Sequence, residues 1–234
     1  VIDEETKEKL IAEDPKSAEI IKPYLRGRDI KRYRIDYPNL YLIFTRRGIK
    51  IEDYPAIEGY LAPFKARLMP GSGRKPGNYK WFEIQDIIDY WQEFEKPKIV
   101  YPDIARAPNF AFDTNGAYLA NTAYLIPMDD RYLLGLLNSS LISFYYPYLS
   151  PAIRGEFLRF FSIYMEKVPV ALASSQAKNE VTELVNEILQ INEELPELER
   201  LMDDLPQLVE GEGIPTQDLA DTPGVTLHIP NPLG

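Results

Sequence analysis

The stretch from Ile20 to Arg34 reads I-I-K-P-Y-L-R-G-R-D-I-K-R-Y-R and combines strand-forming residues with turn signals and positive charge. Six of its residues are Lys or Arg, and Asp29 is its one acid. Pro23 and Gly27 disfavour a single helix here, because proline lacks the backbone N–H and glycine loses the most conformational freedom. The sequence therefore predicts an irregular, partly β-structured basic segment that the rest of the chain presents.

Positive charge is concentrated around this stretch, although the 234-residue chain as a whole has a net charge of −10. Residues 20–80 hold 14 basic and 5 acidic side chains, whereas residues 171–234 hold 2 basic and 13 acidic ones. A basic segment followed by an acidic one indicates a face for a polyanion on an otherwise acidic protein.

The composition excludes several kinds of chemistry. The chain has no cysteine and one histidine, His228, so disulfides, cysteine-based zinc sites and cysteine nucleophiles are absent. A Ser-His-Asp triad or a histidine-rich metal site has almost nothing to build from. The chain begins with Val1 and shows no signal peptide, so we interpret it as a fragment of a longer protein and expect it to be cytoplasmic.

The first 170 residues alternate short apolar runs with turn signals. The expected strands are 41–44, 98–101, 109–112 and 123–126. The expected helices are a short one within 1–19, one over 54–68 that starts at Pro55 and buries Ile57, Tyr60, Leu61, Phe64 and Leu68, and an apolar one over 131–146. The polar residues and short length of 131–146 argue against a membrane span. This order predicts an α+β fold: a small antiparallel or mixed sheet with packed helices, followed by a long heptad-patterned helix.

The heptad pattern occupies residues 176–205. Its apolar positions are Val181, Leu184, Ile188, Ile191, Leu195, Leu198, Met202 and Leu205, spaced alternately by three and four. Pro196 interrupts the run and should kink the helix or start a second one. Such a stripe needs a partner, so we expect a helix–helix contact through Val181, Leu184, Ile188, Ile191 and Leu195. Residues 206–234 are acidic and rich in Pro and Gly, which predicts an extended tail.

The basic residues offer binding chemistry, since Lys and Arg neutralise phosphates and Arg also grips a guanine edge. The candidates are Arg26, Arg28, Lys31, Arg32, Arg46, Arg47, Lys50, Arg74, Lys75, Lys80 and Trp81, with Tyr79 beside them. Three basic loops that alternate with apolar elements are expected to line one groove. The alternative is that these are solvated charges or ion pairs, such as a local network of Arg28, Asp29 and Lys31.

Catalytic motifs are missing from the sequence. It contains neither a Gly-rich nucleotide cradle nor the Asn/Asp-Pro-Pro-Tyr/Phe tetrapeptide of amino-group DNA methyltransferases. Pro102-Asp103 opens like a metal-dependent nuclease motif, but no Glu-x-Lys or Asp-x-Lys follows. We therefore predict that the chain itself binds but does not catalyse.

Seven pieces in the same order make residues 18–170 resemble the TaqI-like target-recognition domains of N6-adenine DNA methyltransferases and of fused type II restriction-modification enzymes. The pieces are Pro23–Tyr33, Tyr54–Phe64, Tyr79–Glu83, Phe94–Ile99, Phe110–Asp113, Leu136–Ser139 and Arg154–Pro169. The resemblance implies a DNA-binding domain at 1–170, a spacer-type helix at 171–205 and a tail at 206–234.

The same resemblance implies double-stranded DNA as a partner and a methyltransferase domain upstream in the parent protein. S-adenosylmethionine would bind there, and no cofactor is expected in this chain. We expect Arg26, Arg28 and Arg32 to stabilise the fold or to bind phosphates, and the later loops to read bases. We expect Gly27 to adopt a positive φ. The alternative function is a protein-interaction or dimerisation module organised by the heptad helix.

Overall fold

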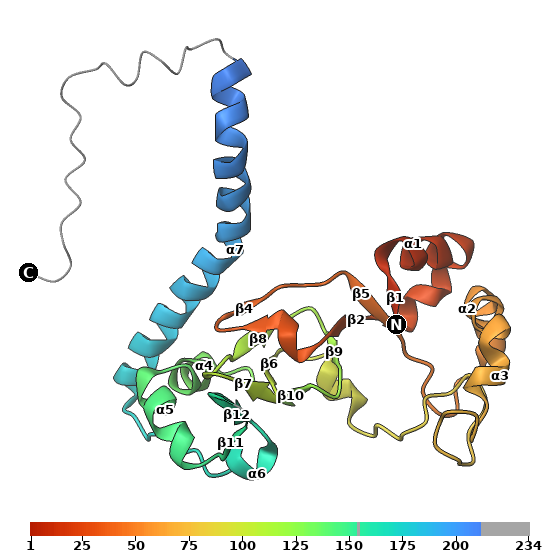
Figure 1. Ribbon diagram of the computed structural model, residues 1–234, viewed down its shortest axis with the longest axis horizontal. Helices are drawn as coiled ribbons and strands as arrows, with labels where there is room; N and C mark the ends of the chain where they lie inside the picture. The colour runs from red at the N-terminus through yellow and green to blue at the C-terminus, as the bar shows by residue number, and fades with distance from the viewer. Residues whose placement is uncertain (154, 212–234) are drawn as a thin grey trace, which may run out of the picture. The chain divides into compact units, whose positions relative to one another are not determined.

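The computed structural model describes residues 1–153 and 155–211 (Figure 1). The chain forms two compact units, Val1–Leu189 and Gln190–Gly234. All described strands lie in the first unit, and in the second the described residues continue helix α7 (Ser175–Gly211). No helix in the described part of the chain is long and apolar enough to cross a membrane.

The N-terminal part of the first unit is a four-stranded mixed sheet covered by helices. Its order is β1 (Ile2–Asp3), β5 (Leu40–Ile43), β2 (Ile21–Leu25) and β9 (Tyr118–Leu119). The β2–β9 pair is parallel and the other two pairs are antiparallel. Helices α1 (Glu4–Glu13), α2 (Pro55–Leu61) and α3 (Lys65–Leu68) lie at this end of the unit (Figure 1).

The other end of the unit is built from two three-stranded antiparallel sheets. One has the order β10 (Ala123–Ile126), β6 (Lys98–Pro102), β8 (Ala111–Asp113), and the other β11 (Ala152–Ile153), β12 (Phe157–Arg159), β7 (Ile104–Ala105). A small hairpin pairs β3 (Ile30–Lys31) with β4 (Arg34–Ile35). Helices α4 (Arg131–Leu137), α5 (Ser140–Tyr145) and α6 (Ser162–Met165) complete this end. The predicted α+β fold and its four strands are thereby confirmed.

Two predicted helices are each interrupted. The helix expected over 54–68 begins at Pro55 but breaks at Ala62–Phe64, where Pro63 lacks the N–H that a continuous helix needs. Its expected buried face was wrong in part, since Ile57 is fully buried whereas Phe64 is 42% exposed.

The apolar stretch 131–146 forms two helices, because the chain turns at Asn138 and Ser139. The Asn138 side chain exchanges two hydrogen bonds with the backbone of Phe110, at 2.9 and 3.1 Å. The Ser139 hydroxyl then caps α5 by accepting from Ile142 N at 3.2 Å. Helix α4 is buried as expected, but α5 was expected to be buried and instead exposes Leu141 and Phe144 by 68% and 69%. Side-chain bonds to the backbone end the first helix.

The start of α7 packs on the core of its own unit. Val185 is 2% exposed and joins a cluster with Leu134 and Leu137 of α4. Gly135 makes the approach possible, because a Cβ there would lie 2.9 Å from methyl groups of Val181 and Val185. Leu184, which the heptad pattern placed in the contact, is 58% exposed. The packed stripe therefore follows the spacing of a helix lying on a globular core rather than a heptad seam.

Helix α7 runs through Pro196 as one helix to Gly211, so the second helix expected at the proline does not form. The expected tail therefore begins later than residue 206. Its remainder, 212–234, lies outside the described residues, as do the side chains of the heptad positions Leu198, Met202 and Leu205.

Candidate nucleic-acid interface

The basic stretch forms the end of β2, a 3₁₀ turn at Gly27–Asp29 and the β3–β4 hairpin. Arg26 grips the buried Asp29 carboxylate with two side-chain bonds of 2.9 and 2.8 Å, and its own N–H donates to the same carboxylate at 2.8 Å. Burial of Asp29 acts to raise its pKa, but the bonds from Arg26 outweigh burial and hold the pKa below its ordinary value. The Arg26 guanidinium is thus engaged in holding the turn.

Gly27 brings this turn against the loop before β10. Its N–H donates to Thr122 Oγ1 at 3.0 Å, and a Cβ at this position would lie 2.3 Å from the carbonyl oxygen of Thr122. The expectation of a positive φ at Gly27 was wrong, because its φ lies outside the left-handed region. Glycine is needed here for a close backbone approach instead.

Three further predicted arginines donate to backbone carbonyls. Arg32 Nη2 donates to Asn138 O at 2.6 Å, and Arg47 Nη2 donates to Gln85 O at 2.6 Å. Arg74 donates to the carbonyls of Leu68, Trp81 and Glu83, the first at 2.7 Å. These guanidinium groups are thus engaged in holding loops of the fold.

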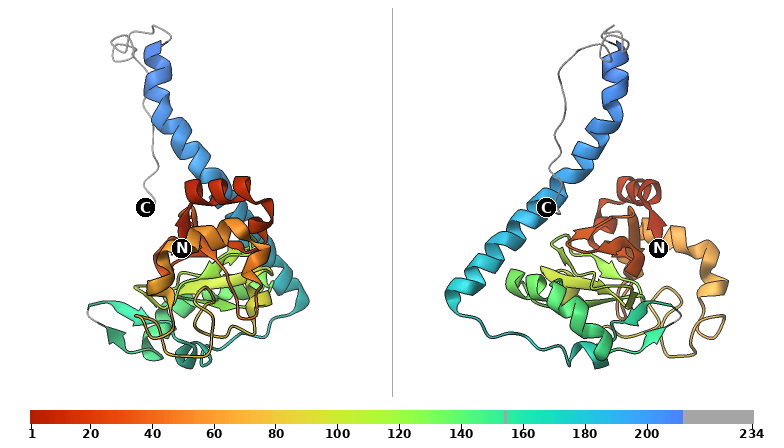
Figure 2. Two further views of the ribbon diagram at one scale, coloured as in Figure 1. Left: turned by 90° about the vertical axis from the view of Figure 1, so that its right-hand side faces the viewer. Right: turned by 60° about the vertical axis from the view of Figure 1, so that its left-hand side comes forward.

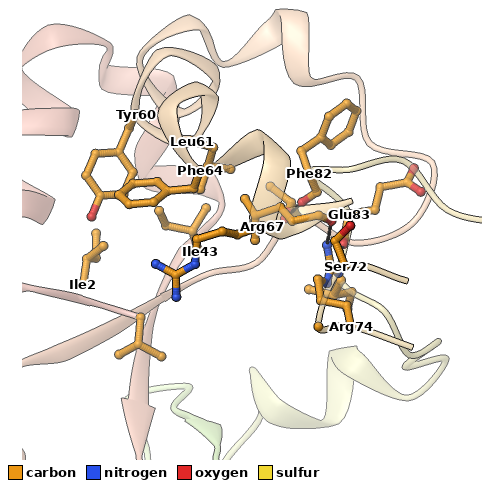
Figure 3. A pocket seen from close by; sticks show the side chains of 15 residues that line it. Ile2, Ile43, Tyr60, Leu61, Phe64, Arg67, Ser72, Arg74, Phe82 and Glu83 are labelled. Carbon is orange, nitrogen blue, oxygen red and sulfur yellow. Dashed lines mark hydrogen bonds between the residues drawn. The ribbon is translucent and has the colours of Figure 1, made fainter. Parts of the chain in front are cut away.

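The three basic loops line separate hollows among the described residues. Arg74 borders a cavity of about 730 Å³ beneath α2 and α3, where Figure 3 shows Arg67 among the apolar side chains and Arg74 beside Glu83. Arg46 and Arg47 border a smaller hollow of about 200 Å³, with Arg46 5.3 Å above the Trp91 ring. The loops at 46–50 and 74–81 nevertheless meet at Tyr79, whose ring centre lies 5.2 Å from the Arg47 guanidinium and 4.8 Å from that of Arg74. Arg28 and Lys31 of the first loop border another groove. A groove lined by all three loops therefore stays a prediction.

Some of the remaining candidates contact other side chains of the fold, and others do not. Lys75 pairs with Asp86 at 2.8 Å, and Lys80 lies 5.4 Å above the Phe82 ring. Trp81 is half-buried against the N-terminal core. Lys50 is exposed, and no ion pair engages it within the described part of the chain.

The groove in which Arg28, Lys31 and Arg106 lie is about 740 Å³ in volume and is formed by four segments distant in sequence, including Phe157 of β12. Arg28 and Lys31 come from the basic stretch, Arg106 follows β7, and Asn121 lies in the loop before β10. Lys31 Nζ donates to Arg28 O at 2.6 Å, and no carboxylate pairs with Arg28, Lys31 or Arg106 among the described residues. Asp103 is the one acid on the lining.

Sequence reasoning missed Arg106, Asn109 and Asn121 because each stands alone, outside any basic run. Their position in turns between predicted strands could have indicated them, because side chains in such turns project away from a sheet. Fold contacts, rather than local charge density, bring them beside Arg28 and Lys31.

The described residues thus define a small α+β domain whose polar chemistry lies on loops, and they contain no cluster of acidic or histidine side chains suited to a metal ion. The family model described as the TaqI-like C-terminal specificity domain matches residues 22–170, and the chain belongs to this family. The match has nearly the limits that the resemblance predicted.

Relatives and one solved structure agree with this assignment. The type II methyltransferase M.BstVI of Geobacillus stearothermophilus is 24% identical over 72% of this chain and 31% of its own length. The type II methyltransferase M.XhoI of Xanthomonas vasicola is 24% identical over 63% of this chain and 28% of its own. The type IIL restriction-modification enzyme MmeI, solved in complex with DNA, shares the fold with a TM-score of 0.54 at 16% identity, over 81% of this chain and 25% of that one. The chain spans about a third or less of each.

Proposed function

We propose that residues 1–170 recognise a specific site on double-stranded DNA and direct an adenine-N6 methyltransferase, with or without a fused endonuclease, to that site. Membership of the specificity-domain family supports the class of function. The observation that carries the proposal for this chain is the groove where Arg28, Lys31 and Arg106 remain unpaired. Unpaired cations in a hollow are suited to phosphate and base edges, whereas cations that hold the fold are not.

The proposal assigns chemistry to a partner domain rather than to this chain. The chain binds DNA and catalyses no reaction, while S-adenosylmethionine binds a methyltransferase domain upstream in the parent protein, in the cytoplasm. Helix α7 (Ser175–Gly211) serves as a spacer-type helix. Of the predicted DNA-binding residues, Arg26, Arg32, Arg47 and Arg74 are reassigned to holding loops, and Arg28, Lys31, Arg46, Lys50 and Lys80 are kept as phosphate contacts.

A salt titration of duplex binding tests this function. If about six phosphates are contacted, the affinity falls about 10³-fold between 50 and 200 mM salt. Lys31→Ala should lower the slope by about one charge, whereas Lys9→Ala on the exposed side of α1 serves as a matched control that leaves it unchanged. Binding that is absent, or equally strong at both salt concentrations, would refute the proposal.

A second candidate function is self-association or docking through α7, since Leu184 and Ile191 are 58% and 57% exposed. Leu184 is not buried by the described residues of the first unit, so a second protein surface could bury it. Sedimentation should then show dimers that dissociate when Leu184 and Ile191 are both replaced by Asp. A monomer at high concentration would exclude self-association.

A further inference from the structure

We propose that Arg106 reads a guanine and is a specificity-determining residue of this chain, with Phe157 as the residue that positions it. The inference rests on the proposed DNA recognition and names the part of the groove that discriminates between bases. Neither residue belongs to the basic loops that the sequence singles out.

Strand register places the two side chains together. Strands β7 and β12 pair antiparallel with Ala105 opposite Leu158, so the next position outward puts Arg106 opposite Phe157. The Arg106 guanidinium carbon lies 5.0 Å from the centre of the Phe157 ring. Directly opposite residues on one face of a sheet are neighbours, and a cation above an aromatic ring is attracted to it. The ring of Phe157, on β12, therefore supports the guanidinium of the residue that directly follows β7.

The polar edge of this guanidinium remains unused. Four other arginines donate their N–H groups to carboxylates or carbonyls, namely Arg26, Arg32, Arg47 and Arg74. In the part of the chain that the structure describes, Arg106 has no hydrogen bond or ion pair. Phe157 is 38% exposed, so the ring that contacts Arg106 lies at the surface. A ring contact fixes the plane of an arginine while leaving its donors free for a ligand.

The surroundings match a groove that reads bases. Strands β11 and β12 lie at the edge of the unit in the left view of Figure 2. Arg106 and Phe157 are both exposed, so a duplex edge can approach them. Asn109 and Asn121 line the same groove and carry amides of the kind that pair with adenine. Arg28 and Lys31 supply charge for the flanking phosphates. The lining thus contains both positioning contacts and donors for direct readout.

Guanine is the base that this arrangement fits. Its major-groove edge presents two acceptors, N7 and O6, which match the parallel N–H donors of one guanidinium. A lysine at the same place offers a point charge without the fork, so it holds phosphate without selecting the base. Asp103 lies on the same lining, and its carboxylate disfavours a phosphate close by while accepting from a cytosine amino group.

Selection of binding sites from a randomised duplex pool by the 234-residue chain tests the inference. The unmodified chain should enrich a motif containing at least one fixed guanine. Arg106→Ala and Arg106→Lys should both lose that preference, with affinity for the enriched duplex lowered about 10- to 100-fold, while the other motif positions stay fixed. Phe157→Leu keeps an apolar side chain and should weaken the same position and no other. Lys31→Ala, the matched control, should weaken all duplexes alike and leave the motif intact.

Each outcome separates the two proposals. Absence of any enriched motif with the unmodified chain contradicts the proposed function itself. A motif that persists unchanged in Arg106→Ala, with thermal unfolding confirming that the variant is folded, overturns the guanine assignment and leaves DNA recognition standing. A Phe157→Leu variant that lowers affinity evenly at all positions removes the positioning role from Phe157.

Discussion

The buried pair of Lys98 and Asp113 offers a stability test whose magnitude follows from its contacts. Both side chains are 0% exposed, and Lys98 Nζ contacts Asp113 Oδ2 and donates to Phe94 O at 2.6 Å. Asp113 also accepts from Tyr37 and from the N–H groups of residues 115 and 117, at 2.9 to 3.0 Å. The pair joins β6 and β8 to the turn before β6.

Removing one member of such a pair leaves a buried charge without its counterion and costs about 3–5 kcal/mol. Lys98→Met should lie near about 3 kcal/mol, because Asp113 keeps three donors. Asp113→Asn should lie near the upper end, because the Lys98 ammonium keeps only a carbonyl. The double variant should lose less than the sum of the two single losses, since it leaves no unpaired charge.

The pH dependence provides a second readout. Burial lowers the pKa of Lys98, and Asp113 opposes this shift, so Asp113→Asn should lower the pKa further. A lysine whose pKa is lower in the folded than in the unfolded state binds fewer protons when folded, so stability rises with pH between the two values. Asp113→Asn should therefore regain stability towards alkaline pH more steeply than the unmodified chain.

Urea unfolding of the four proteins, repeated from pH 7 to pH 10, measures both effects. Tyr37→Phe serves as a control that removes one neutral donor and should cost about 1 kcal/mol. Single variants within about 1 kcal/mol of the unmodified chain, or strictly additive losses, would show that the pair does not carry the stabilisation assigned to it.

Three further outcomes are expected from the same unfolding assay. Gly27→Ala should lower the free energy of unfolding by about 1–3 kcal/mol, because its Cβ would meet a backbone carbonyl at 2.3 Å. Gly59→Ala, in the open space beside α2, should raise the free energy of unfolding by up to about 1 kcal/mol. Equal effects of the two substitutions would contradict the close approach at Gly27. Arg74→Ala should lower the free energy of unfolding by about 2–3 kcal/mol, because three backbone carbonyls lose their donor. Lys75→Ala, at an exposed ion pair, should lower it by less than about 1 kcal/mol. The reverse order would refute the structural role of Arg74. The pKa of Asp29 is lower in the folded than in the unfolded state, where it is 3.8, so its ionised carboxylate stabilises the fold above pH 3.8 and this stabilisation is lost as pH falls through the folded pKa. Asp29→Asn should therefore reduce the loss of stability in acid. An unchanged dependence of stability on acid pH would contradict this role of Asp29.

Periodicity predicted the strands because it reports which residues of a short segment share a buried face. The runs at 98–101 and 123–126 became β6 and β10, since their β-branched and aromatic residues suit a pleated sheet. The same reasoning overestimated helix length at Pro63 and Asn138, where one missing N–H and one side-chain bond end a helix. Local pattern therefore located the elements better than it located their ends.

The site was less accessible to sequence reasoning, because it depends on contacts between distant residues. Gly27 and Thr122 meet across 95 positions, and this contact helps to place Arg28 beside Asn121 and Arg106. Similarly, nothing local distinguishes Arg74, which donates to carbonyls, from Arg28, which has no ion pair among the described residues. Family resemblance correctly indicated the class of domain but assigned roles to a segment that is shared, whereas discrimination between sites requires positions that differ.

The alternation along β12 has a consequence for how the lining of the groove can vary. Leu158 packs in the core, its neighbour Phe157 lines the groove, and Arg106, which follows β7, lies on the same lining. A strand turns successive side chains to opposite faces, so a mutation at an outward position leaves the inward packing untouched. Substitutions at positions 106 and 157 can therefore change the lining of the groove while Leu158 keeps its place in the core.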